Sequence, residues 1–148
     1  MGINWAYYKQ RLREDIVVLP TWFKNPVNGM RNLPHWEWPT ILVLQGAFAA
    51  ACSIVGNFIQ RDYFGLVTGI VVAPIACVLM VGISTGFFHY AFIFYAKREL
   101  SFRAIYLNIL FASIPLLTVN MVAYLVPPII LVGLIASLML AFVGFVDT

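Results

Sequence analysis

The chain has 148 residues, of which 62% are hydrophobic and only 10% are charged, and its formal net charge at pH 7 is +3. Globular domains average about 45–50% apolar and about 25% charged residues, so this composition excludes an ordinary water-soluble domain. A net charge this small gives no reason to expect nucleic acid as a partner. We expect an integral membrane protein surrounded by the lipid bilayer.

The N-terminal segment, residues 4–19, has the periodicity of an amphipathic helix. The basic residues lie outside its apolar face. Pro20 is expected to end the helix because proline lacks a backbone donor. Such a helix before a membrane span is typical of an element lying in the membrane interface. Packing on the protein's own cytoplasmic loops is an equally good interpretation. The apolar face, at spacings of three and four, consists of Trp5, Tyr8, Leu12, Ile16 and Leu19.

Residues 21–39 are expected to be irregular, because three prolines divide them and Asn28-Gly29 predicts a turn. Tryptophan favours the headgroup region of a bilayer, where the ring is buried and its N–H stays hydrated. The chain's four tryptophans are therefore predicted to be interfacial anchors: Trp5, Trp22, Trp36 and Trp38. Residues 1–39 are assigned to a cytoplasmic or interfacial segment, and residues 40–148 to a transmembrane domain.

Four long apolar runs follow, at Thr40–Ile59, Gly65–Tyr95, Ala104–Leu125 and Ile129–Val146. Crossing a hydrocarbon core takes about 17–25 residues, so each run is long enough and the second is longer than needed. The sequence thus predicts an all-α bundle of about four spans. For the second run we favour one long helix kinked at Pro74. The alternative is a short re-entrant piece before Pro74, followed by a full span.

The basic residues alternate between the connections. Lys and Arg number five before the first run, one after it, three after the second and none after the third. The positive-inside rule then places the N-terminus and the second connection in the cytoplasm. The residues predicted to form one cytoplasmic basic face are Lys9, Arg11, Arg13, Lys97, Arg98 and Arg103.

Small residues recur at every fourth position in the second and fourth runs, where they let helix backbones approach closely. The predicted helix-packing positions are Gly82, Gly86, Gly133 and Ser137. They fit a compact bundle or a self-associating protein equally well.

No Asp, Glu, Lys or Arg lies in the middle of a run, which weighs against ion-coupled transport. For His89, a hydrogen-bonded structural role is favoured over proton relay. The strongly polar residues in or at the edge of the runs are Gln45, Asn57, His89, Asn108 and Asn120.

The sequence contains no pattern that predicts catalysis or cofactor binding. It has no HExxH, no GxSxG, no phosphate-binding loop and no paired carboxylates within the runs. Cys52 and Cys77 are interpreted as small apolar residues, and His35 and Glu37 are wrongly arranged for a metal site. We therefore expect no enzyme, no catalytic residue, no cofactor and no metal.

Two parts of the chain carry recognisable features. The first is WFKNP at residues 22–26, followed by an amphipathic turn and an aromatic-proline entry to the first span. The second is FHY at residues 88–90, a short basic connection with SFR at residues 101–103, and ASIPL at residues 112–116. In these parts the chain resembles the bacterial branch of the Ypt-interacting-protein (Yip) domain family. The resemblance implies a non-enzymatic polytopic protein that acts through partners.

Members of that family have five spans and this chain supplies four, which is consistent with a further C-terminal span. The acidic-aromatic segment of eukaryotic members is absent, so GTPase binding is not carried over. We expect a multi-pass protein of a bacterial inner membrane, acting as a scaffold or accessory subunit through other membrane proteins or self-association. The alternatives are a component of a small-solute transporter or channel, and a lipid-interacting or membrane-shaping protein.

Overall fold

The computed structural model describes residues 5–97, 100–123 and 125–146, apart from the side chains of residues 5, 6, 8, 9, 11, 63, 64 and 68. The described part of the chain is helical and contains no β-strand, which confirms the predicted all-α class. Its elements are α1 (Trp5–Ile16), α2 (Val18–Lys24), α3 (Pro26–Arg31), α4 (Trp38–Gln60), α5 (Tyr63–Ala91), the π-helix η1 (Phe92–Ala96), α6 (Phe102–Val122) and α7 (Ile129–Val146).

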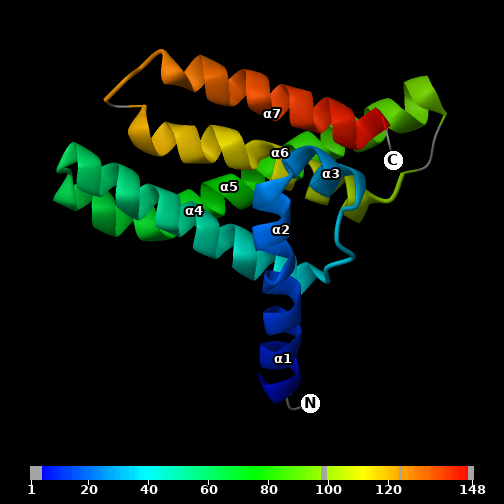
Figure 1. Cartoon of the computed structure of the whole chain (residues 1–148), viewed down its shortest axis with the longest axis horizontal. Coiled ribbons are helices and arrows are strands. Elements are labelled where there is room, and N and C mark those ends of the chain that lie inside the picture. The colour runs from blue at the N-terminus through cyan, green and yellow to red at the C-terminus, as the bar shows by residue number, and fades with distance from the viewer. Residues whose placement is uncertain (1–4, 98–99, 124, 147–148) are drawn as a thin grey trace.

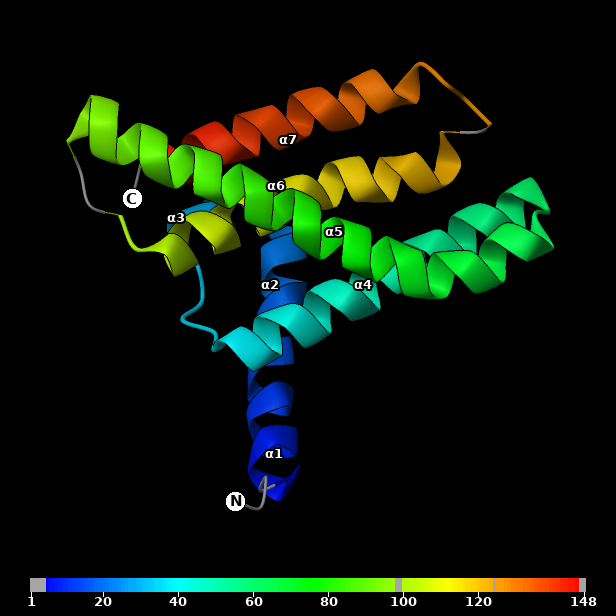
Figure 2. The same cartoon turned by 180° about the vertical axis from the view of Figure 1, so that it is seen from behind.

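The four long helices form two antiparallel hairpins, α4 with α5 and α6 with α7 (Figures 1 and 2). The connections within the hairpins, of which the structure describes residues 61–62, 123 and 125–128, lie at one end of the bundle, which we call the turn end. The helices α4 and α6 begin at the opposite end, where η1 and α7 finish. There the ring of Phe145 on α7 packs against Phe88 and Phe92, with centroids 5.2 and 5.3 Å away.

All four predicted spans are present as helices long and apolar enough to cross a membrane. The second is continuous: α5 runs from Tyr63 to Ala91 with Pro74 inside it and passes directly into η1. The favoured single helix is therefore correct, and the re-entrant alternative is wrong. A helix broken at Pro74 would leave backbone groups without partners in the hydrocarbon, whereas a continuous helix satisfies nearly all of them.

The N-terminal segment forms two helices instead of one. The break comes at Val17, and Pro20 lies in the first turn of α2, so the expected stop at Pro20 is wrong. Proline is tolerated there because backbone N–H groups of a first turn have no partner within the helix. The helix α1 packs against α2 and points away from the span bundle (Figures 1 and 2). Its Leu12 is half-buried and its Ile16 exposed, and its interfacial position stays a prediction.

The predicted turn at Asn28-Gly29 is instead part of α3. Asn25 caps this helix by accepting a hydrogen bond from the backbone N–H of Asn28 at 3.2 Å, and Pro26 occupies its first turn. An asparagine cap followed by proline is a strong helix start, because the proline ring already holds the helical φ. Gly29 is needed for a different reason, since a Cβ at this position would collide with the indole of Trp22.

The core joins the N-terminal segment to the spans. Met30 of α3 is 1% exposed, and α3 packs against both α6 and α7. The rings of Trp22 and Trp36 lie 5.5 and 5.3 Å from that of Phe111, which is itself 1% exposed. Residues 18–36 are thus packed into the same hydrophobic core as α6.

Candidate functional site

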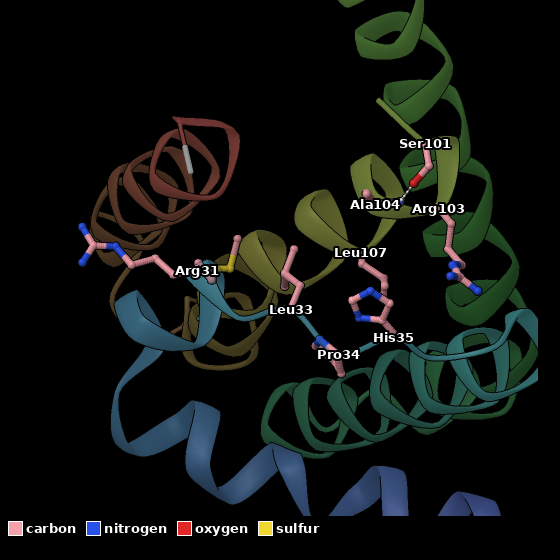
Figure 3. Close-up of a pocket in the computed structure, with 9 residues that line it drawn as sticks. Arg31, Leu33, Pro34, His35, Ser101, Arg103, Ala104 and Leu107 are labelled. Carbon is pink, nitrogen blue, oxygen red and sulfur yellow. Dashed lines mark hydrogen bonds between the residues drawn. The ribbon is translucent and has the colours of Figure 1, made fainter. Parts of the chain in front are cut away.

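One cavity lies between residues 30–35 and the start of α6, at the end of the bundle opposite the turn end (Figure 3). It has a volume of about 330 Å³. The short helix α3 and the extended residues that follow it form one wall, and the first turns of α6 form the other. Its lining residues are Met30, Arg31, Leu33, Pro34, His35, Ser101, Arg103, Ala104 and Leu107. We call this cavity the basic pocket.

The start of α6 is fixed by Ser101, whose Oγ accepts a hydrogen bond from the backbone N–H of Ala104 at 3.2 Å. The first turn of α6 carries Arg103 and no acidic residue. The ring of His35 lies beside Leu107 and on the same side as Arg103, whereas the side chain of Arg31 extends away from them (Figure 3). Among the residues that the structure describes, the lining contains basic and apolar side chains, the hydroxyl of Ser101 and no carboxylate, so it suits an anionic group.

A buried polar link ties three spans together deeper in the bundle. The hydroxyl of Tyr106 on α6 donates to Oε1 of Gln45 on α4 at 2.6 Å. Nε2 of Gln45 in turn donates to Sγ of Cys77 on α5 at 3.5 Å. Gln45 and Tyr106 are 2% and 3% exposed, so this link lies within the protein and away from lipid. A polar pair inside a membrane bundle holds helices together because neither group has water as an alternative.

The second cavity, about 230 Å³ in volume, lies between α4, α5 and α6 on the turn-end side of this link. Its polar lining residues come from α4 and α6, and both cysteines of the chain contribute thiols. The lining consists of Ala49, Cys52, Ser53, Gly56, Asn57, Gln60, Ala73, Cys77, Leu117, Asn120 and Met121. We call this cavity the polar cleft.

The four predicted helix-packing positions divide into two pairs. On α7, a Cβ at Gly133 would lie 2.9 Å from Cβ of Val119, and Ser137 Oγ accepts a hydrogen bond from the backbone N–H of Leu116 at 3.2 Å. This pair packs against α6 within the chain. On α5, Gly82 and Gly86 have nothing within 4 Å of where a Cβ would stand. Within the part of the chain that the structure describes, no other helix therefore packs closely on the GxxxG face of α5.

The tryptophans also divide. Trp22 and Trp36 are 4% and 3% exposed, so they are core residues, and neither ring is free to anchor the protein in lipid headgroups. Trp38 is 39% exposed and packs against Tyr106 with ring centroids 5.2 Å apart. The side chain of Trp5 lies outside the described part, so the anchoring role of Trp5 and Trp38 stays a prediction.

The basic residues predicted to form one face lie on separate elements where the structure describes them. Arg13 is exposed on α1, Lys97 is exposed after η1, and Arg103 lines the basic pocket. The side chains of Lys9 and Arg11, and all of Arg98, lie outside the description. Since α1 leads away from the bundle, the basic pocket, with Arg31 and Arg103, is the better defined basic site.

The remaining polar residues of the spans have different surroundings. His89 packs edge-on against Phe102, with centroids 5.7 Å apart, and its Nδ1 has no hydrogen-bond partner among the described residues. The hydrogen bond expected for this histidine is thus not seen at Nδ1. Asn108 is 1% exposed with neither amide atom bonded, whereas Asn57 and Asn120 line the polar cleft. The sequence singled out Gln45 but missed its partner Tyr106, which is 61 residues away.

Among the described residues no three His, Cys, Asp or Glu side chains gather as a metal site. Comparison with known proteins found no relative: no protein-family model, curated protein or solved structure matches this chain. The resemblance to the Yip domain family therefore stays a prediction from its residues. The function has to be argued from the geometry described above.

Proposed function

We propose that this chain is a non-enzymatic multi-pass membrane protein that acts as a scaffold or accessory subunit, with α5 as its main contact helix. The observation that carries the proposal is the open space around Gly82 and Gly86. Glycines four residues apart allow close approach of a second helix, with gains in packing and weak hydrogen bonds. The chain's own helices do not use this surface, so it is available to a partner helix.

The side chains around the glycine pair support this assignment. Leu79, Ile83 and Tyr90 are 58%, 70% and 66% exposed, whereas Val81 and Thr85 on the other side of α5 are 5% and 0% exposed. One side of α5 therefore packs into the bundle while the glycine side faces outward. A ridge of larger side chains beside a groove at the glycines is the shape that a crossing helix fits.

The basic pocket is the second contact that we propose. His35 and Arg103 would receive an acidic side chain or terminus of a partner at the cytoplasmic side, in the orientation that the positive-inside rule predicts. With this orientation the N-terminus is cytoplasmic, and the resemblance to the bacterial branch of the Yip domain family implies a bacterial inner membrane. Contacts in the membrane and at its cytoplasmic surface would then act together on one partner.

The experiment is photo-crosslinking in native membranes, with the crosslinking residue placed at Ile83 beside the glycine pair. We expect a discrete adduct that disappears when Gly82→Leu and Gly86→Leu fill the groove. Adduct mass distinguishes self-association, at twice the chain's mass, from a different partner, and either result supports the proposal.

The matched control is Ala47→Leu with Ala51→Leu, which makes the same small-to-large change, four residues apart, on an exposed face of α4. This control should retain the adduct. No adduct from Ile83 in the folded, membrane-inserted protein, or an adduct lost equally in both double variants, would refute the proposed role of α5.

A further inference from the structure

The polar cleft has a lining that does not suit lipid. It holds hydrogen-bonding side chains at four positions, Ser53, Asn57, Gln60 and Asn120, together with the two thiols. Nδ2 of Asn57 donates to the carbonyl oxygen and the hydroxyl of Ser53, at 2.9 and 3.2 Å. The exposed side chains of Gln60 and Asn120 make no hydrogen bond to another described residue. An amide without a hydrogen-bond partner is costly in apolar surroundings, so these groups need water or a polar solute.

The cleft reaches the turn end of the bundle. Gln60 is the last residue of α4, and Asn120 and Met121 lie in the last turn of α6, next to the two connections. From Gln60 to Ala49 the lining spans eleven residues of α4, which is about 16 Å at 1.5 Å per residue. The cleft therefore extends from the membrane surface to about half the depth of a hydrocarbon core.

The inner end of the cleft is closed by the buried polar link. Gln45 lies one turn of α4 beyond Ala49 and donates to Cys77, which itself lines the cleft. The 2.6 Å bond from Tyr106 to Gln45 closes the space between α4 and α6. Both residues are almost fully buried, so this link separates the polar cleft from the opposite end of the bundle.

We propose that the polar cleft is a water-filled vestibule, open at the turn end, that takes small uncharged molecules able to form hydrogen bonds. Among the described residues no Asp, Glu, Lys, Arg or His lines it, which argues against a charged ligand, and amide and hydroxyl groups both donate and accept. A volume of about 230 Å³ holds several waters or one small solute. The proposal is independent of the contact at Gly82 and Gly86, because neither residue lines the cleft.

The chain's two cysteines both line the cleft, so they report directly on whether water enters it. A cationic, membrane-impermeant methanethiosulfonate reagent transfers its thioalkyl group to a thiolate, forming a disulfide and releasing methanesulfinate. Thiolates form only where water reaches the sulfur. With the protein in sealed membrane vesicles, Cys52→Ala reports on Cys77 alone and Cys77→Ala reports on Cys52 alone.

Two reference positions bracket the expected rate, each in a Cys52→Ala, Cys77→Ala background. Gln60→Cys marks the mouth of the cleft, and Leu138→Cys marks a lipid-facing position on α7, where the side chain is 62% exposed. We expect Cys77 to react more slowly than Gln60→Cys but about tenfold or more faster than Leu138→Cys, because water reaches only the first two. A bulky aromatic maleimide should label Gln60→Cys and leave Cys77 unmodified.

Asn120→Phe should fill the mouth of the cleft and slow the labelling of Cys77 by about tenfold or more. Gel filtration checks that the variant is folded. Reagent added from the opposite side of the membrane should leave Cys77 unmodified, because the Gln45–Tyr106 bond blocks access. Labelling of Cys77 as slow as that of Leu138→Cys would overturn the vestibule. Equal labelling of Cys77 from both sides of the membrane would overturn the closed inner end of the cleft. An unchanged labelling rate in folded Asn120→Phe would overturn the proposed route of entry.

Discussion

Asn108 brings an amide into the contact between α6 and α7, where neither its oxygen nor its nitrogen has a hydrogen-bond partner among the described residues. A buried polar group left unpaired costs about 1–3 kcal/mol. The amide lies against Gly144 of α7, so closely that a Cβ there would stand 2.6 Å from Cγ of Asn108. With Asn108 only 1% exposed, its side chain has little room to move away. The glycine thus makes space for the amide.

At the residue scale we therefore predict that Gly144→Ala destabilises the protein by about 1–3 kcal/mol through overpacking. The same change in an Asn108→Ala background should cost less than half as much, because the colliding amide is gone. Unfolding in mixed detergent micelles measures both values. Gly82→Ala is the matched control and should leave stability nearly unchanged, since its surroundings are open. Equal costs in the two backgrounds would show that the Asn108 amide is not the reason for glycine at position 144.

Composition reveals which single residues are unusual, but it does not reveal their partners. Gln45 stands out in an apolar run, whereas Tyr106 does not, because tyrosine is common near membrane surfaces. Trp22 and Trp36 show the opposite problem. Tryptophan near a span predicts an anchor, but here the indoles fill the core beside Phe111. Whether a tryptophan is an interfacial anchor or a core residue is decided only by how α2 and the residues around Trp36 pack against α6.

At the scale of elements, α6 contains a proline that its neighbour helps to accommodate. Pro115 has no backbone N–H and crowds the carbonyl of the preceding turn. The next residue, Leu116, donates its backbone N–H to Ser137 of α7 at 3.2 Å. Membrane helices tolerate proline because neighbouring hydroxyl side chains bond the backbone groups that it disturbs. The proline and the serine thus form one contact between two helices.

We predict that Ser137→Ala weakens the α6–α7 pairing by about 0.6–2 kcal/mol, the range for interhelical polar contacts in membranes. The change in unfolding free energy in mixed micelles measures this loss. Ser113→Ala is the control, because Ser113 Oγ donates to the carbonyl of Leu110 within α6 itself, at 2.7 Å. It should cost clearly less. A Ser137→Ala variant as stable as the Ser113→Ala variant would mean that the contact with Leu116 has no net effect.

The long helices were predictable as elements because a bilayer imposes their length. Each predicted run lies within about three residues of the helix found, since apolar residues must continue across the hydrocarbon. The short helix α3 has its own sequence signal in Asn25-Pro26, an N-cap followed by proline, although Asn28-Gly29 within it predicts a turn. The use of small residues was not predictable. Gly82 and Gly133 look alike in sequence, and only the pairing of α7 with α6 separates them.

At the scale of the whole molecule, the N-terminal segment divides between two kinds of structure. Residues 18–36 are part of the core: Trp22 and Trp36 contact Phe111, and Met30 is buried beside α6 and α7. The helix α1 instead points away from the bundle, with Tyr7 50% exposed (Figures 1 and 2). The boundary between the segment and the transmembrane bundle therefore falls near Val17 for packing, well before the first span begins.

This division predicts different outcomes for two changes in the same segment. Deleting residues 1–16 should leave the unfolding free energy of the bundle nearly unchanged. Among the described elements, α1 packs extensively against α2 and not against the four spans. Trp22→Ala should instead cost about 3–5 kcal/mol by opening a cavity beside Phe111. Thermal unfolding in one detergent measures both, and Phe23→Ala, at a neighbouring side chain that is 56% exposed, is the control. If the deletion destabilises the protein as much as Trp22→Ala does, then α1 belongs to the cooperative core and the boundary near Val17 is wrong.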